Sequence, residues 1–184
     1  MRTFPTTSLG VMPNIFALLA MSLVTVSFCA SGGALGEKRL GFTSYGSAHI
    51  GMSRAALETA VGSKLRNEYP DSDTEGCEYV VPQKGYKGVS FMLIDQRVAR
   101  IDISDPKIKT LSGAHIGASE ISVKALYRGR IQITPHAYSS PDGSYLTLLS
   151  QDGRYGLRFE TLEGKIIGFY AGTVEAIQFI EGCL

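Results

Sequence analysis

Apolar and polar residues follow two different periods along the chain. In segments 51–62 and 117–129, apolar residues return every three or four positions, which is the period of an amphipathic helix. Ser53 and Ser119 stand near the start of these segments, where a serine hydroxyl can accept an unpaired backbone N–H. Each segment closes with a glycine, a residue that commonly ends helices. The pattern therefore predicts two short helices, each capped by a serine.

Elsewhere apolar residues occupy every second position, as they do in half-buried strands. Val89, Phe91 and Leu93 alternate in this way, and so do Ala99, Ile101 and Ile103. A three-residue turn over 95–97 puts both apolar sets on one face, whereas a two-residue turn would invert the second strand. We prefer the three-residue turn because it gives the cleaner apolar face.

The opposite face of these strands is the candidate binding surface, because it carries polar and charged side chains. Segment 156–159 matches segment 88–91 in pattern, which extends the face into the second half of the chain. The predicted binding residues on this face are Met92, Arg100, Asp102, Arg158, Glu160 and Tyr170.

A short repeat links the two halves of the chain. Ala48-His49-Ile50-Gly51 returns as Ala114-His115-Ile116-Gly117, and each copy precedes one of the predicted helices. A helix, a strand with a tyrosine and a hairpin then follow in the same order. We therefore expect a tandem duplication, with one unit over 35–107 and the other over 108–184. Helices followed by strands, without strand–helix alternation, predict an α+β fold with helices packed on one side of antiparallel sheets.

The first helical segment also carries a family resemblance. Gly51-Met52-Ser53-x-x-x-Leu57-x-x-x-Val61-Gly62 resembles a segment of the β-lactamase-inhibitory-protein-like group and of the SmpA/OmlA (BamE-type) outer-membrane lipoproteins. The second segment departs from the motif, with Ala118 in place of methionine. The resemblance implies a small exported envelope protein that works by protein–protein contact on an exposed sheet face.

The N-terminal residues predict export. Arg2 is the only charged residue in the first 36 positions, and an apolar run over 15–30 is followed by small residues. This order is typical of a secretory signal peptide, assigned here to residues 1–34. The run is shorter than the roughly 20 residues of a membrane-spanning helix, so we expect no stable membrane insertion after cleavage. Phe28 before Cys29 disfavours a lipid anchor, and the expected location is periplasmic or secreted.

Two cysteines remain in the expected mature chain, Cys77 and Cys183. In an oxidising compartment such a pair most simply forms a disulfide, although two free buried thiols are the alternative. The sequence therefore predicts a Cys77–Cys183 bond that fastens the end of the chain.

Charge and motifs narrow the class of function. Without the first 36 residues the chain carries 17 acidic residues and an equal number of basic ones, so nothing indicates nucleic-acid binding. His49 and His115 form a conceivable metal pair, but further ligands are missing from the pattern, and we expect neither metal nor cofactor. His136, Ser139 and Asp142 can be written as a catalytic triad, yet no nucleophile motif accompanies them.

The sequence thus favours an exported, non-catalytic module that binds another envelope or secreted protein through its sheets. An inhibitor, an immunity-type protein and an envelope-assembly factor all fit this description. The alternative is an envelope hydrolase or a small carbohydrate- or peptide-binding protein. A deep polar pocket would favour the alternative.

Overall fold

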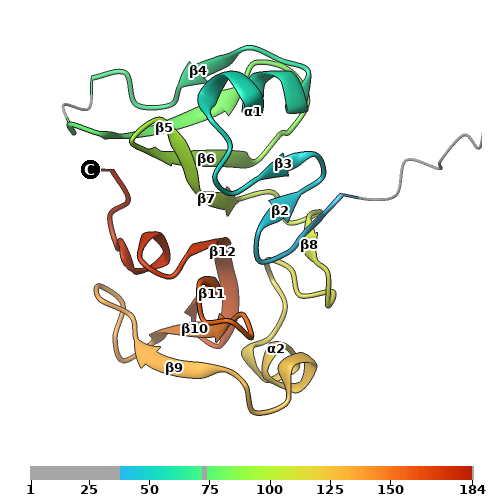
Figure 1. Ribbon diagram of the computed structural model, residues 1–184. Helices are drawn as coiled ribbons and strands as arrows, with labels where there is room; N and C mark the ends of the chain where they lie inside the picture. Colours follow the sequence, from blue (N-terminus) through green and yellow to red (C-terminus); the bar gives the residue numbers. More distant parts are fainter. Residues whose placement is uncertain (1–37, 72–73, 184) are drawn as a thin grey trace, which may run out of the picture. The chain divides into compact units, whose positions relative to one another are not determined.

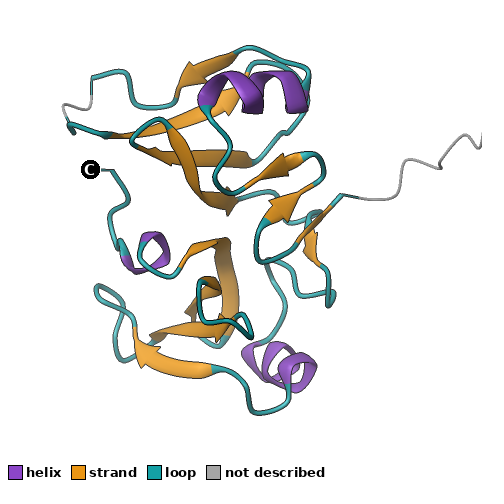
Figure 2. Cartoon of the chain, in the orientation of Figure 1, coloured by secondary structure: helices purple, strands orange, loops and turns teal. Residues whose placement is uncertain are grey.

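The computed structural model describes residues 38–71 and 74–183 (Figure 1). The predicted signal peptide, residues 1–34, lies outside the described residues. Strands dominate the described part, and they form one sheet of four strands and one of eight (Figure 2).

The eight-stranded sheet has the strand order β4-β5-β6-β7-β12-β11-β10-β9. All of its neighbouring strands are antiparallel. β7 pairs directly with β12, which joins the two halves of the chain in one continuous sheet. The strands are β4 (Leu65–Asn67), β5 (Cys77–Pro82), β6 (Val89–Ile94), β7 (Arg97–Ile103), β9 (Gln132–Pro135), β10 (Gly143–Leu149), β11 (Tyr155–Leu162) and β12 (Lys165–Thr173).

The four-stranded sheet is built from very short strands in the order β3-β2-β1-β8. β8 lies in the second half of the chain but pairs in parallel with β1. This sheet therefore also crosses the boundary predicted at residue 107. Its strands are β1 (Arg39–Leu40), β2 (Ser44–Tyr45), β3 (Ala48–His49) and β8 (Lys109–Thr110).

The described residues contain two α-helices, α1 (Arg54–Val61) and α2 (Glu120–Tyr127), and a short 3-10 turn, η1 (Ala176–Gln178). Both predicted serine caps are confirmed, because Ser53 and Ser119 each accept a backbone N–H from the first turn. Gly62 caps the end of α1 in the left-handed conformation, as predicted. The cap of α2 is instead Arg128, one residue before Gly129, and it also has the left-handed conformation.

The repeated Ala-His-Ile-Gly sequence has a structural explanation. Ala48 and Ala114 are both buried in the core. Gly51 has a φ of 89° and donates its N–H to Val98 in β7. Gly117 has a φ of 87° and donates to Ile166 in β12. The repeat thus specifies a packed alanine and a left-handed glycine that fastens each helix to a strand.

The main core lies against one face of the eight-stranded sheet. The four-stranded sheet and both helices supply its other side, through residues such as Leu40, Leu57 and Val123. On the large sheet its centre consists of fully buried side chains, namely Phe91, Leu93, Ile101, Leu146, Phe159 and Phe169. The alternation predicted for β6 is therefore correct, and so are the predicted positions of Ile101 and Ile103 in β7.

The predicted fold class is wrong. An α+β tandem of helix-plus-sheet units, with helices packed on one side, would contain a substantial helical layer. The described residues instead form a mostly β fold with two sheets, and each α-helix is only eight residues long. Both sheets also combine strands from the two predicted units. The sequence missed the four-stranded sheet because strands of two residues are too short to show a hydrophobic period.

The turn between β6 and β7 also differs from the prediction. Ile94 pairs with Arg97, so the turn has two residues, both with positive φ. A β-bulge then shifts the register, because Leu93 pairs with Val98 while Met92 pairs with Arg100. The extra residue of the bulge restores the faces that the two-residue turn would have inverted. The faces of residues 100–103 were therefore predicted correctly from an incorrect turn. Ala99 was predicted on the core face, but it packs with Met92 in a separate cluster.

This bulge makes Gly172 in β12 sensitive to substitution. A Cβ there would lie 2.3 Å from the backbone oxygen of Ala99, the extra residue of the bulge. Gly172→Ala is therefore expected to lower the free energy of unfolding by about 1–3 kcal/mol. Gly168 is the control, because a Cβ on it meets no atom within 4 Å. Urea denaturation should show little change for Gly168→Ala. Equal losses of stability in both variants would contradict the predicted clash between a Cβ at position 172 and the Ala99 backbone oxygen.

Candidate functional site

The second face of the eight-stranded sheet, opposite the main core, is the polar face. The strand register places all six predicted binding residues on it, because directly paired residues share a face. Residues that the sequence analysis did not select also lie there. The polar face comprises Tyr79, Met92, Arg100, Asp102, Gln132, Thr134, Tyr145, Thr147, Arg158, Glu160 and Tyr170.

The chain after β12, the C-terminal segment (residues 174–183), covers the middle of this face. It contains η1, which contacts β7, β11 and β12 (Figure 1). The predicted disulfide is confirmed, since Cys183 is bonded to Cys77 at the start of β5. Beneath the segment, Met92 packs with Ala176 and Cys183 in a second apolar cluster. Much of the polar face is therefore buried under the chain's own C-terminal segment, and Met92 is fully buried.

Arg100 fastens the C-terminal segment to the sheet. It is only 4% exposed, and its guanidinium donates to the backbone oxygens of Ala176 at 3.0 Å and Phe179 at 2.9 Å. It also forms an ion pair with Asp102 at 3.0 Å and donates to the Tyr79 hydroxyl. Every one of these partners belongs to the chain itself. Arg100 is thus fully engaged in holding the fold together.

The titratable groups around Arg100 respond mainly to burial. Burial raises the pKa of the Asp102 carboxyl, and the neighbouring Arg100 works against this rise. Burial also raises the pKa of the Tyr79 and Tyr170 hydroxyls, so both remain protonated at neutral pH. This part of the face therefore holds one ion pair and neutral phenols.

Arg158 has a different environment, although it lies on the same face. It is 7% exposed, and its guanidinium donates to Thr147 Oγ1 at 2.9 Å and to Gln178 Oε1 at 2.5 Å. Both acceptors are neutral, and no carboxylate among the described residues forms an ion pair with it. A buried cation with only neutral partners is costly, so the Arg158 guanidinium is suited to an acidic partner.

Tyr145 lies beside Arg158. Its ring stacks on His136, with the ring centres 4.5 Å apart, and the Arg158 guanidinium lies 5.1 Å from the Tyr145 ring centre. The residue is 5% exposed, and within the described residues its hydroxyl has no hydrogen-bond partner. The Ala137 backbone N–H interacts with this oxygen, and the hydroxyl proton has no acceptor among the described residues. Buried hydroxyls normally donate to a partner, so the Tyr145 proton is an unused donor beside Arg158.

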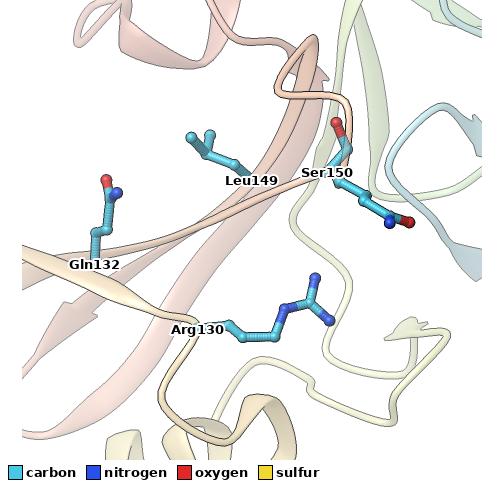
Figure 3. Close-up of a pocket in the computed structure, with 5 residues that line it drawn as sticks. Arg130, Gln132, Leu149 and Ser150 are labelled. Carbon is cyan, nitrogen blue, oxygen red and sulfur yellow. The ribbon is translucent and has the colours of Figure 1, made fainter.

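The binding groove is the hollow over β9 and β10 beside the C-terminal segment. One part, about 340 Å³, lies over Tyr145, Thr147 and Arg158, with Gln178 and Ile180 on its wall. A second part, about 410 Å³, extends past Arg130 and Ser150 (Figure 3). The two parts are adjacent, because Gln132 and Leu149 line both of them.

The charge of the binding groove has one sign. Of the described residues that line it, Arg130 and Arg158 are charged, and none is acidic. The acidic residue two positions along β11, Glu160, lines a separate pocket of about 220 Å³ with Arg100 and Asp102. The binding groove therefore favours a negatively charged ligand.

The catalytic triad written from the sequence does not form. His136 Nδ1 accepts the backbone N–H groups of Tyr138 and Ser139, so Nε2 carries the proton. Nε2 faces the Glu160 carboxylate at 3.8 Å. In the described structure, the side chains of Ser139 and Asp142 form no hydrogen bond with the ring. The arrangement orients His136 beneath Tyr145 rather than toward a nucleophile.

The described residues also show no metal-ligating cluster of three or more His, Cys, Asp or Glu side chains. His49 is exposed at the end of β3, and His115 bonds to the backbone oxygen of the next residue. None of the described helices has the length and apolarity needed to cross a membrane.

Comparisons with known proteins add two weak structural likenesses. No protein-family model matches the chain, and no curated protein is similar to it. An extracellular protein containing an SCP domain from Bacillus anthracis str. Ames has a TM-score of 0.47 and 15% identity, over 77% of this chain and 51% of that one. The chain thus spans about half the length of that protein. The uncharacterized protein yfeY from Escherichia coli has a TM-score of 0.47 and 14% identity, over 73% of this chain and 99% of that one.

At this level of similarity the two structures do not assign the chain to a family. Neither of them is described as a β-lactamase-inhibitory protein or as a BamE-type lipoprotein. The resemblance of segment 51–62 to those two groups stays a prediction.

Proposed function

We propose that the chain is an exported, non-catalytic module that binds a segment of another envelope or secreted protein in the binding groove. The observation that carries this proposal is the groove itself, an open hollow over β9 and β10 whose polar floor includes Gln132, Thr134 and Thr147. Amide and hydroxyl side chains of this kind can donate to and accept from a peptide backbone. The disulfide supports export, because such bonds persist in oxidising compartments.

The dimensions of the groove favour an extended protein segment over a compact ligand. The groove follows β9, which has four residues, and strands rise about 3.3 Å per residue. An extended segment of similar length therefore fits along it. The pocket between Arg100, Asp102 and Glu160 is smaller, and Arg100 and Asp102 are already paired with each other there.

Photo-crosslinking in an envelope extract tests the location of the binding surface. A photoreactive residue at Gln132, which is exposed on the groove floor, is expected to capture one protein species. The same residue at Lys87, which is exposed between β5 and β6, is the control. Capture of one species from both positions, or from Lys87 only, would contradict the proposal.

A further inference from the structure

We infer that Arg158 and Tyr145 form a receptor for one acidic side chain, an aspartate or glutamate within the extended segment of the bound protein. This inference rests on the proposed function, because it names the chemistry of the segment that the binding groove takes. The two groups that carry it are each more than nine-tenths buried and line the same hollow. One offers a positive charge, and the other offers a hydroxyl proton without an acceptor.

A carboxylate satisfies both groups at once. The Arg158 guanidinium has five N–H donors, and the structure uses only Nε and Nη2, on neutral acceptors. A carboxylate has two oxygens, so it can accept from the remaining guanidinium donors and from the Tyr145 hydroxyl. Such charge-assisted hydrogen bonds are about twice as strong as neutral ones, and Arg is especially suited to carboxylates.

The comparison with Arg100 shows that buried arginines on this face do not generally lack a carboxylate partner. Arg100 has the Asp102 carboxylate and two backbone oxygens as partners, all within the chain. Arg158 is buried to a similar degree but has no acidic partner among the described residues. The difference indicates that the counter-charge of Arg158 lies outside the described residues, and we assign it to the bound segment.

The position of Arg158 in the groove favours an acidic side chain within the bound segment over the carboxylate at the end of a chain. Across the strands it lies in one row with Thr147 and Gln132. The groove continues from this row in both directions, to Arg130 and Ser150 on one side and to Ala137 and Ile180 on the other. A segment can therefore pass Arg158 and extend beyond it at both ends, with its acidic side chain directed to the floor.

Selection from a random peptide library displayed on phage tests the inference on the processed, disulfide-bonded protein. The selected peptides are expected to share an Asp or Glu at one position with residues on both sides. Changing that residue to its amide, or Arg158→Gln in the protein, is expected to weaken binding by about tenfold or more. Arg66→Gln on β4, the opposite outer strand, makes the same charge change and is expected to leave binding unchanged.

Tyr145→Phe separates a ligand contact from a structural role. It removes a buried hydroxyl that has no partner, so the melting temperature is expected to stay the same or rise. Peptide affinity is nevertheless expected to fall several-fold. If Arg158→Gln does not fold, two measurements still test the inference. They are the peptide affinity of Tyr145→Phe and the affinity of the unmodified protein for the amide-substituted peptide.

The outcomes distinguish this inference from the proposed function. Selected peptides without a shared acidic residue, bound equally by Arg158→Gln but lost in the groove variant Gln132→Trp, would overturn the carboxylate receptor and leave the groove as a binding site. A library that yields no binding peptide would overturn both.

Discussion

Replacing Cys77 and Cys183 with serine is expected to lower the free energy of unfolding by about 4 kcal/mol. The bond joins residues separated by 106 positions, and closing so long a loop removes much of the entropy of the unfolded chain. The same change also loosens the C-terminal segment, because Cys183 packs with Met92 and Ala176 under it. The loss is measured by urea denaturation of the double-serine variant beside the unmodified protein.

Reduction supplies the control for this prediction. Dithiothreitol should destabilise the unmodified protein by a similar amount and leave the double-serine variant unchanged. The far-ultraviolet circular dichroism of the folded variant should keep its strand signal, because the β7–β12 pairing does not depend on the bond. A loss of less than about 1 kcal/mol would show that the C-terminal segment is held without the disulfide.

Arg100→Met is expected to destabilise the protein by about 3–5 kcal/mol, the usual result of removing one partner of a buried ion pair. The substitution leaves the Asp102 carboxylate without its counter-charge. It also leaves the backbone oxygens of Ala176 and Phe179 without a donor, which frees η1 from β7. Urea denaturation measures the loss. Hydrogen exchange should show faster exchange in the C-terminal segment than in the strands.

Arg158→Met is the matched control. It removes the same charge from the same face, but it leaves no carboxylate unpaired, and Thr147 and Gln178 are neutral. The expected loss is therefore at most about 1 kcal/mol. Equal and large losses in Arg100→Met and Arg158→Met would show that Arg158 is also a structural residue, and the carboxylate receptor would then lose its main support.

The sequence predicted part of the polar face but not its burial. Alternation over β6 and β7 placed Met92, Arg100 and Asp102 together, and the register confirms this. The C-terminal segment has no hydrophobic period, so nothing in its pattern predicted that it returns to this face. The predicted disulfide could have indicated this return, because Cys77 begins a strand of the sheet and a bond to it brings Cys183 back to that sheet.

The most informative residue of the site was missed. Tyr145 was not among the predicted binding residues, yet alternation in β10 places it and Thr147 opposite the buried Leu146 and Leu148. That pattern could have added both residues to the predicted face. The absence of a partner for the Tyr145 hydroxyl depends on tertiary neighbours, however, and is visible only in three dimensions.

A double-mutant cycle tests the central claim most directly. It combines Arg158→Gln in the protein with the amide substitution of the shared acidic residue in a selected peptide, and the four affinities are measured by titration calorimetry. If Arg158 contacts that carboxylate, the two changes are strongly non-additive, with a coupling of about 1.5 kcal/mol or more. Changes that simply add would place the acidic residue elsewhere and contradict the account.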